Sequence, residues 1–187
     1  MIITGGITPH PSGGRGAKLS EPADVPMHRT VTDAVHAADP EVKICMQILH
    51  AGRYAYHPLA VAPSRLQSPI SPFTPFALSA SGVERQIRAF VRCAKLAREA
   101  GYDGVEIMGS EGYFINQFLV THTNQRTDEW GGSYENRMRL PLEILARIRE
   151  AVGPDFIVIY RLSMLDLIPN GSSWDEVLEL ARRVAKG

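Results

Sequence analysis

Four short runs of apolar and β-branched residues recur along the chain, at residues 2–4, 42–49, 104–108 and 156–162. Each run is continuous and does not alternate between apolar and polar positions. Continuous runs of this length are typical of parallel strands that are covered on both faces. The pattern therefore predicts four buried parallel strands.

Helical patterns occupy the intervals between these runs. Apolar residues recur at helical spacing over residues 83–97, which predicts a helix that begins at the capping box Ser81-x-x-Glu84 and stops at Gly101. The other helices are predicted at residues 27–38, at residues 134–152, and from a second capping box at Ser173-x-x-Glu176 onward.

Strand and helix alternate four times, and alternation at this pitch implies a parallel α/β fold. A doubly wound sheet needs a Gly-x-Gly-x-x-Gly turn after its first strand, and the sequence after residues 2–4 does not supply one. A (β/α)8 barrel instead builds its active site from polar residues that follow its strands. Such residues are present here: Gln47, His50, Glu111, Tyr113 and Arg161.

A complete (β/α)8 barrel needs eight units and about 250 residues, whereas this chain has 187 residues and about four units. The sequence therefore predicts a partial (β/α)8 TIM barrel of the α/β class, as one incomplete domain over residues 1–187. Part of a barrel leaves two strand edges without neighbours, and we expect these edges to favour self-association.

Composition narrows the classes of function. The 20 basic and 20 acidic side chains give a formal net charge of +0, which argues against nucleic acid and anionic membranes as partners. Cys45 and Cys93 are the only cysteines, too few for a four-cysteine metal or iron–sulfur site within the chain, and we expect no bound metal. Neither a membrane-length apolar run nor a secretory signal is readable, so we expect a cytoplasmic location.

Three polar residues in or after apolar strands have both a structural and a functional interpretation. Gln47 either bonds the backbone or pairs with a ligand edge that presents donors and acceptors. His50 is either a structural histidine or a hydrogen-bonding partner of a ligand. Arg161 either forms an internal salt bridge, for instance with Asp166, or faces an anionic or electron-rich ligand.

Gly109 and Gly112 lie on either side of Glu111, and Gly112 directly precedes Tyr113, which allows a ligand to approach the backbone closely. Tyr113 is either a packed aromatic residue or a general acid. Glu111 tunes Tyr113, polarises a substrate, or is merely solvated. The segment 116–134 is expected to be a compact polar loop, and the charged residues of segment 124–137 are expected to form an ion-pair network that shapes it.

Four segments together resemble the old yellow enzyme family of flavin-dependent reductases: residues 47–53, 100–107, 112–118 and 124–137. Residues 108–113 and 160–166 are similar in particular to the 2,4-dienoyl-CoA reductase branch of that family. The resemblance covers nearly the whole chain, whose strands correspond to the second to fifth strands of the family's barrel.

The resemblance implies an FMN-binding barrel that takes electrons from NAD(P)H and reduces the C=C bond of a 2,4-dienoyl-CoA or related unsaturated carbonyl, as in fatty acid β-oxidation. It implies that Gly6, Gln47 and Arg161 contact FMN and that Tyr113 donates a proton, with Glu111 beside it. It also places four residues near the substrate: His50, Thr123, Asn124 and Gln125.

The chain also departs from the family pattern. Met108 and Glu111 stand where many members carry a His and an Asn, and His122 stands where the dienoyl-CoA branch has an Arg. Glu111 and His122 keep open an amine dehydrogenase or NADH oxidase type of activity, and the count of about four units keeps open an inactive half barrel. The FAD and 4Fe-4S cluster of the full dienoyl-CoA enzymes are expected only in parts of the parent protein outside this chain, and we expect the isolated fragment to be inactive.

Overall fold

The computed structural model describes residues 1–186 and is built around a four-stranded parallel sheet in the order β1-β2-β5-β6. The strands are β1 (Ile2–Ile7), β2 (Ile44–Ile48), β5 (Gly104–Gly109) and β6 (Ile157–Leu162). Each coincides with one of the four apolar runs, so the predicted strands and their parallel pairing are confirmed. The architecture is that of a partial barrel.

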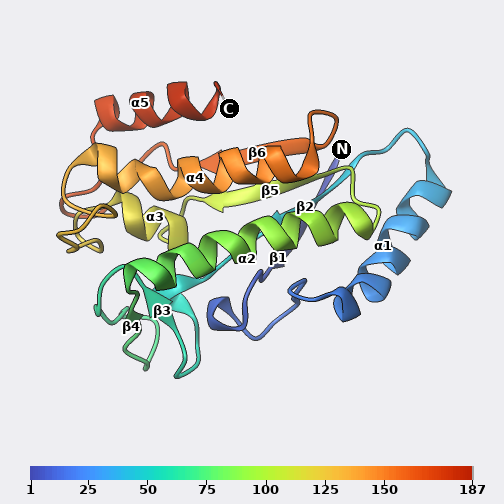
Figure 1. Ribbon diagram of the computed structural model, residues 1–187. Helices are drawn as coiled ribbons and strands as arrows, with labels where there is room; N and C mark the ends of the chain where they lie inside the picture. The colour runs from blue at the N-terminus through green and yellow to red at the C-terminus, as the bar shows by residue number, and fades with distance from the viewer. Residues whose placement is uncertain (187) are drawn as a thin grey trace.

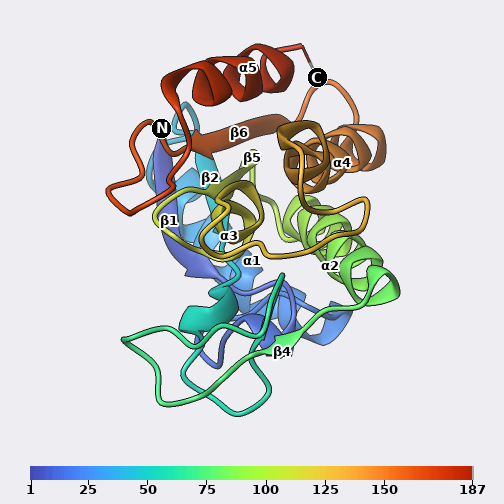
Figure 2. The ribbon, with the colours of Figure 1, turned by 90° about the vertical axis from the view of Figure 1, so that its left-hand side faces the viewer.

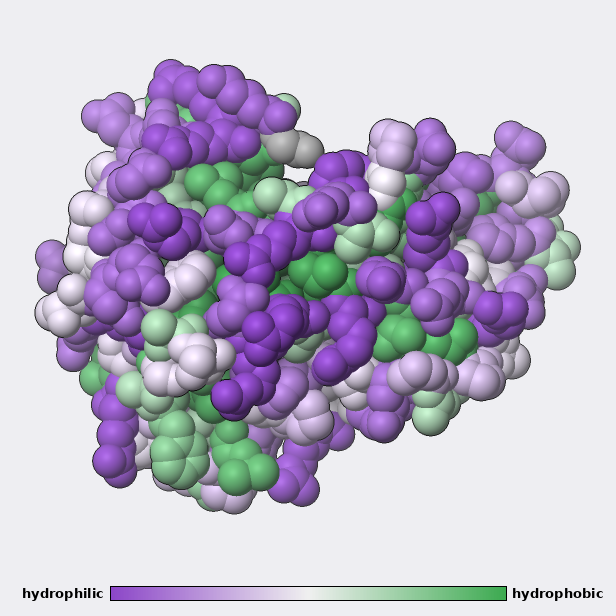
Figure 3. Space-filling view, viewed as in Figure 1, coloured by the Kyte–Doolittle hydropathy of each residue, from purple (hydrophilic) through white to green (hydrophobic). Residues whose placement is uncertain are grey.

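Four long helices alternate with these strands: α1 (Val25–Ala38), α2 (Ala80–Glu99), α4 (Tyr134–Val152) and α5 (Trp174–Val184). Helices α2 and α4 lie side by side along one face of the sheet (Figures 1 and 2). The main core forms there, between apolar residues of β2 and β5, such as Ile48 and Ile107, and helix residues such as Phe90 and Ile144. The outer side of these helices is largely hydrophilic (Figure 3).

The helix boundaries confirm one predicted capping box and correct the other. At α5, Ser173 Oγ accepts from Glu176 N–H, and the Glu176 carboxylate accepts from Ser173 N–H, as predicted. At α2 the cap is Ser79, whose Oγ accepts from Gly82 N–H at 3.1 Å, so the helix begins before Ser81. The extended backbone of Ser79 allows this capping contact, and Ser81 already lies inside the helix.

The two faces of the sheet differ, because helices cover only one of them. Paired residues of parallel strands point to the same face, so Gln47 and Glu106 share the face opposite the core residues Ile48 and Ile107. The predicted burial on both faces holds for β2 and β5 but is wrong for the outer strands. Most of β1 is exposed and most of β6 is half-buried, because the second face has no covering layer within residues 1–186.

The connections contain more structure than the sequence predicted. The short helix α3 (Phe114–Leu119) includes the first residues of segment 116–134, which was expected to be loop, and Figure 2 shows it in front of the strand ends. The long segment after β2 contains β3 (Val61–Ala62) and β4 (Phe76–Ala77), which pair in parallel. Three 3-10 turns complete the connections: η1 (Pro11–Gly13), η2 (Pro22–Asp24) and η3 (Gly52–Tyr54).

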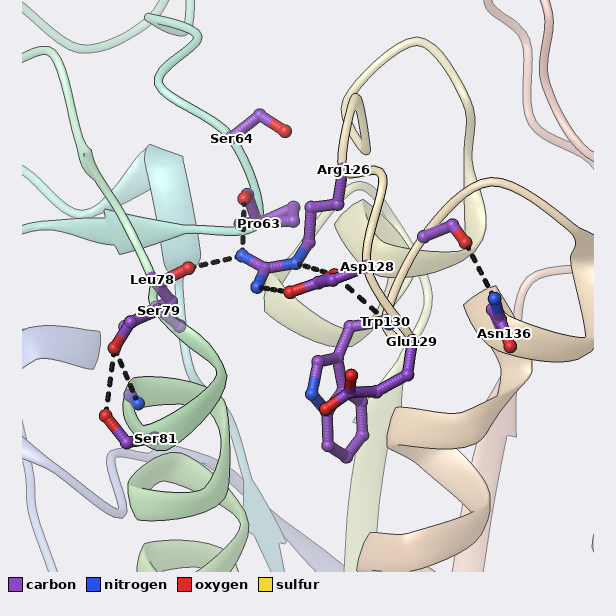
Figure 4. Close-up of polar contacts among 12 residues, drawn as sticks. Pro63, Ser64, Leu78, Ser79, Ser81, Arg126, Asp128, Glu129, Trp130 and Asn136 are labelled. Atoms are coloured by element: carbon purple, nitrogen blue, oxygen red, sulfur yellow. Dashed lines mark hydrogen bonds and ion pairs between the residues drawn. The ribbon is translucent and has the colours of Figure 1, made fainter.

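Arg126 holds the long loops together near the strand ends (Figure 4). Its guanidinium donates to the backbone carbonyls of Pro63 and Leu78, and its Nε donates to Asp128 at 2.9 Å. The expected pairing of Arg126 with Asp128 is therefore confirmed. Arg137 and Glu135 instead pair with residues outside the segment, Glu176 and Arg183, so the expected ion-pair network within the segment is wrong beyond Arg126 and Asp128.

None of the helices within residues 1–186 combines the length and the apolar character that crossing a membrane requires.

Candidate active site

Two of the polar residues predicted at the strand ends, Gln47 and Arg161, lie on the face of the sheet that the helices leave uncovered. Gln47 lies on β2 opposite Glu106 of β5, and its Nε2 donates to the Glu106 carboxylate at 2.6 Å. Glu106 and Met108 are two residues apart on β5, so their side chains point to the same face of the sheet. Met108 pairs in register with Arg161 of β6, and Arg161 therefore points to the same face as Glu106. The amide of Gln47 and the guanidinium of Arg161 thus share one face, two strands apart.

Arg161 forms an ion pair with Glu111, with Nη2 and Oε1 2.7 Å apart. Both side chains are about half exposed, so water screens the pair and its stabilising contribution is small. Glu111 reaches this position because its backbone is left-handed, with φ of 60°. Asp166, the partner considered from the sequence, is instead a hydrogen-bond acceptor for Ser163 Oγ at 2.8 Å.

Tyr113 is the N-cap residue of α3 and is half-buried beside the strand ends. Its ring meets the ring of Tyr54 edge to face, with centroids 5.8 Å apart and planes at 78°. The next amide, Phe114 N–H, donates to the carbonyl of His50 at 3.0 Å. The start of α3 is therefore tied to the end of β2, which fixes Tyr113 at the same end of the sheet as Gln47 and Arg161.

His50 lies beneath this surface and not in it. Its side chain is 1% exposed, and its ring lies against Phe114, with centroids 4.2 Å apart. Nδ1 accepts from Gly52 N–H at 3.0 Å, so in the neutral ring Nε2 carries the proton and donates to Ser12 Oγ. Burial lowers the pKa of His50 to about 3, which keeps the ring neutral at physiological pH. In this geometry His50 supports the loops, and its predicted contact with substrate stays untested.

The three residues predicted near the substrate have different surroundings. Asn124 is buried, and its amide donates to the carbonyls of Phe118 and Trp130 at 2.7 and 2.8 Å, which describes a loop-supporting residue. Thr123 lines the cavity described below, although its hydroxyl donates to backbone carbonyls. Gln125 is exposed on the surface. Contact of any of them with substrate remains a prediction.

A cavity of about 240 Å³ opens beside this cluster, between η3, α3 and residues 163–168. Gln117 of α3 organises its wall: Oε1 accepts from Arg53 N–H at 3.1 Å, and Nε2 donates to the Gly112 carbonyl at 2.7 Å. Arg53 and Gln117 are not among the site residues predicted from the sequence. The signal available was an Asn116-Gln117 pair between apolar residues in the segment Phe114–Leu119, where a buried amide must be paired.

A parallel sheet with helices on one face and polar residues at its carboxyl ends defines a segment of a barrel enzyme. The chain belongs to the NADH:flavin oxidoreductase / NADH oxidase family, whose sequence pattern matches residues 1–186. This confirms the resemblance on which the fold and cofactor expectations rested.

Known proteins similar to this chain catalyse different reactions. A metal reductase of Desulforamulus reducens is 39% identical over 173 residues, which are 90% of this chain and 26% of the relative. A 2-naphthoyl-CoA reductase solved in complex with 2-naphthoyl-CoA superimposes with a TM-score of 0.93 and 32% identity over 100% of this chain and 31% of that one. Histamine dehydrogenase from Rhizobium sp. 4-9 gives a TM-score of 0.86 and 31% identity over 96% of this chain and 28% of that one. The chain thus spans about a quarter to a third of each of these proteins.

Family membership implies a flavin cofactor, and the residues at the strand ends suit FMN. The Gln47 amide has both a donor and an acceptor, which matches the mixed edge of a flavin pyrimidine ring. Arg161 supplies a permanent positive charge on the same face. Gly6 pairs in register with Gln47, and a Cβ there would lie 2.8 Å from the Leu49 side chain, so Leu49 packs directly on this glycine. Within residues 1–186 no cluster of three potential metal ligands occurs.

Proposed function

We propose that this chain is the FMN-contacting part of an NAD(P)H-dependent oxidoreductase that reduces the C=C bond of a 2,4-dienoyl-CoA or a related unsaturated carbonyl compound. The observation that carries the proposal is the grouping of Gln47, Arg161 and Tyr113 at one end of the sheet. The similarity to a reductase that acts on an aromatic acyl-CoA supports an acyl thioester as the substrate class.

In this proposal Gly6, Gln47 and Arg161 hold the flavin ring. When bound and reduced, FMN supplies the hydride that adds to one alkene carbon. The Arg161 guanidinium stabilises negative charge close to it, because an arginine stays protonated throughout. Glu111 holds Arg161 through their ion pair and sets the orientation of that charge.

Tyr113 donates the phenol proton to the second alkene carbon, which completes the addition of two hydrogens across the double bond. Solvent then restores the phenol proton. Tyr113 suits this role because α3 fixes its backbone while its side chain stays half-buried, between the protein and the open end of the sheet.

The test is Tyr113→Phe in a protein that carries this chain together with the rest of a complete barrel. We expect the rate of dienoyl-CoA reduction to fall by about 10²–10⁴-fold, the usual contribution of a general acid. Reduction of the bound flavin by NAD(P)H should stay unchanged, because no substrate proton is needed for it. Stopped-flow absorbance separates the two half-reactions.

The control Tyr56→Phe changes an exposed tyrosine and should leave both rates unchanged. An unchanged rate of dienoyl-CoA reduction in Tyr113→Phe would remove the acid assignment.

A second candidate is oxidation of an amine, which the similarity to histamine dehydrogenase favours. The same protein, assayed against a panel of amines and dienoyl-CoA esters, distinguishes the two. Turnover of amines without reduction of dienoyl-CoA would support the second candidate and contradict the first. For either reaction we infer that the isolated chain is inactive, because none of the residues assigned above holds the FMN phosphate.

A further inference from the structure

Glu106 is a buried carboxylate of β5 for which packing gives no reason. It is 5% exposed, between the fully buried apolar residues Val105 and Ile107. None of the ion pairs among residues 1–186 includes it. Removing a carboxylate from water is unfavourable, and no cation offsets the cost here. Stability alone therefore does not explain this residue, which indicates a role in the site.

The polar contact that Glu106 does make is with Gln47. The two residues lie opposite each other on neighbouring strands, and Gln47 Nε2 donates to Glu106 Oε1 at 2.6 Å. An amide has a donor end and an acceptor end of nearly the same shape, whereas a carboxylate only accepts. The reversed amide would bring two acceptor oxygens together. Glu106 therefore holds the nitrogen end of the Gln47 amide.

The backbone of Gln47 is fixed as well. Gln47 N–H donates to Thr4 Oγ1 of β1 at 3.1 Å, where β1 has one residue more than β2 between the pairs Ile3–Cys45 and Gly6–Gln47. The side-chain oxygen of Gln47 accepts no hydrogen bond within residues 1–186, and the residue is half-buried. Residue 47 is thus held at its backbone and at Nε2, and Oε1 stays free.

We propose that Glu106 is a positioning residue, which fixes the Gln47 amide with its oxygen free for a ligand and so makes this end of the sheet select a ring edge that carries an N–H donor. The inference rests on the proposed function, which assigns Gln47 to the flavin ring. The pyrimidine part of a flavin has one N–H group between two carbonyls. Gln47 Oε1 supplies the acceptor for that N–H group, and the second N–H of Nε2 is left for a carbonyl.

The orientation of the amide is tested by NMR in the ¹⁵N,¹³C-labelled chain without a ligand. The two Nε2 protons of Gln47 are assigned by through-bond correlation to its side-chain carbons. We expect one of them far downfield of the other, because a short hydrogen bond to a charged oxygen deshields it. In Glu106→Gln this separation should decrease. The control Glu99→Gln changes an exposed carboxyl on α2 and should keep the separation.

The consequence for the ligand is tested in the flavin-free form of the complete-barrel protein described above. Riboflavin and 3-methylriboflavin differ in that a methyl group replaces the N–H donor of the ring edge. We expect the wild type to bind riboflavin about tenfold more tightly or better, which corresponds to one hydrogen bond. Titration of flavin fluorescence measures both dissociation constants.

The ratio of the two dissociation constants isolates the role of Glu106. Glu106→Gln should reduce the preference for riboflavin, because the new amide donates as well as accepts and lets the Gln47 amide turn over. Any clash of the methyl group with the protein is the same in both proteins. A residue that only supported the fold would change both affinities alike, and Glu99→Gln should change neither.

Two results would overturn the proposal. The first is a pair of Gln47 Nε2 protons with ordinary shifts in the wild-type chain, which needs no variant and stays decisive if Glu106→Gln fails to fold. The second is a preference for riboflavin that is equal in the wild type and in Glu106→Gln, which overturns this proposal and leaves the proposed function standing. A wild-type protein that binds neither flavin would overturn the proposed function together with the selection of a flavin edge.

Discussion

Burial determines what each polar residue near the strand ends can do. Arg161 and Glu111 are about half exposed and pair where a bound ring can reach them. His50 comes three residues after Gln47 in the chain but is almost fully buried, with both ring nitrogens in hydrogen bonds. The side chains of Arg161 and Glu111 are therefore open to a ligand in this geometry, whereas that of His50 is not.

The lowered pKa of His50 predicts how the chain responds to acid. The folded-state pKa of about 3 lies below the ordinary value of 6.5, so protonation favours the unfolded state. The stabilisation is complete above about pH 6.5 and is lost as the pH falls from there toward 3. We expect the free energy of unfolding to decrease in this window by up to about 1.4 kcal/mol per pH unit from His50 alone.

Urea unfolding of His50→Gln and of the wild-type chain at several pH values isolates this contribution. The difference between the two should shrink as the pH falls, because the variant has no imidazole to protonate. His10 and His57 also have lowered pKa values, caused chiefly by burial, and remain in both proteins. The control His122→Gln alters an exposed histidine and should keep the wild-type slope. A slope in His50→Gln as steep as in the wild type would contradict the assignment.

At the scale of elements, sequence periodicity found those helices that have one apolar and one polar face. Helix α3 was missed because its six residues are too few to show a helical period and because its polar residues, Asn116 and Gln117, are buried with the apolar ones. Gln47 and Arg161 could be placed on a common face because strand register is regular. The partner of Arg161 could not be predicted, since it depends on the left-handed turn at Glu111.

Arg126 links three segments, and this predicts a strongly destabilising substitution. Its side chain is 8% exposed and donates to Asp128, Pro63 and Leu78. Arg126→Ala leaves two carbonyls and a carboxylate without their donor, and we expect a loss of about 2–4 kcal/mol in the free energy of unfolding. The control Arg88→Ala removes an exposed pair with Glu84 and should cost less than about 1 kcal/mol. Equal effects in urea unfolding would show that Arg126 does not hold the loops.

At the scale of the whole molecule, the partial barrel has one helix-covered face and one open face. The open face carries the polar cluster at its carboxyl end and apolar side chains farther along the outer strand β1. Ile3 pairs in register with Cys45 and so points to the open face, where it is 39% exposed. Outer strands of a sheet also keep unpaired backbone groups, which favour association with another chain.

These features predict that the chain self-associates through β1 and the open face. Ile3→Lys should weaken association, because a charged side chain on an outer strand opposes pairing and its burial is unfavourable. Burial of one isoleucine contributes about 1.5–3 kcal/mol, so we expect the dissociation constant to rise by about tenfold or more. Sedimentation velocity over a range of concentrations measures this dissociation constant.

The control Val31→Lys places the same charge at a similarly exposed position on α1, away from the open face, and should leave the dissociation constant unchanged. Equal weakening in both variants would mean that net charge controls association, and a monomeric wild-type chain at all concentrations would contradict the prediction outright.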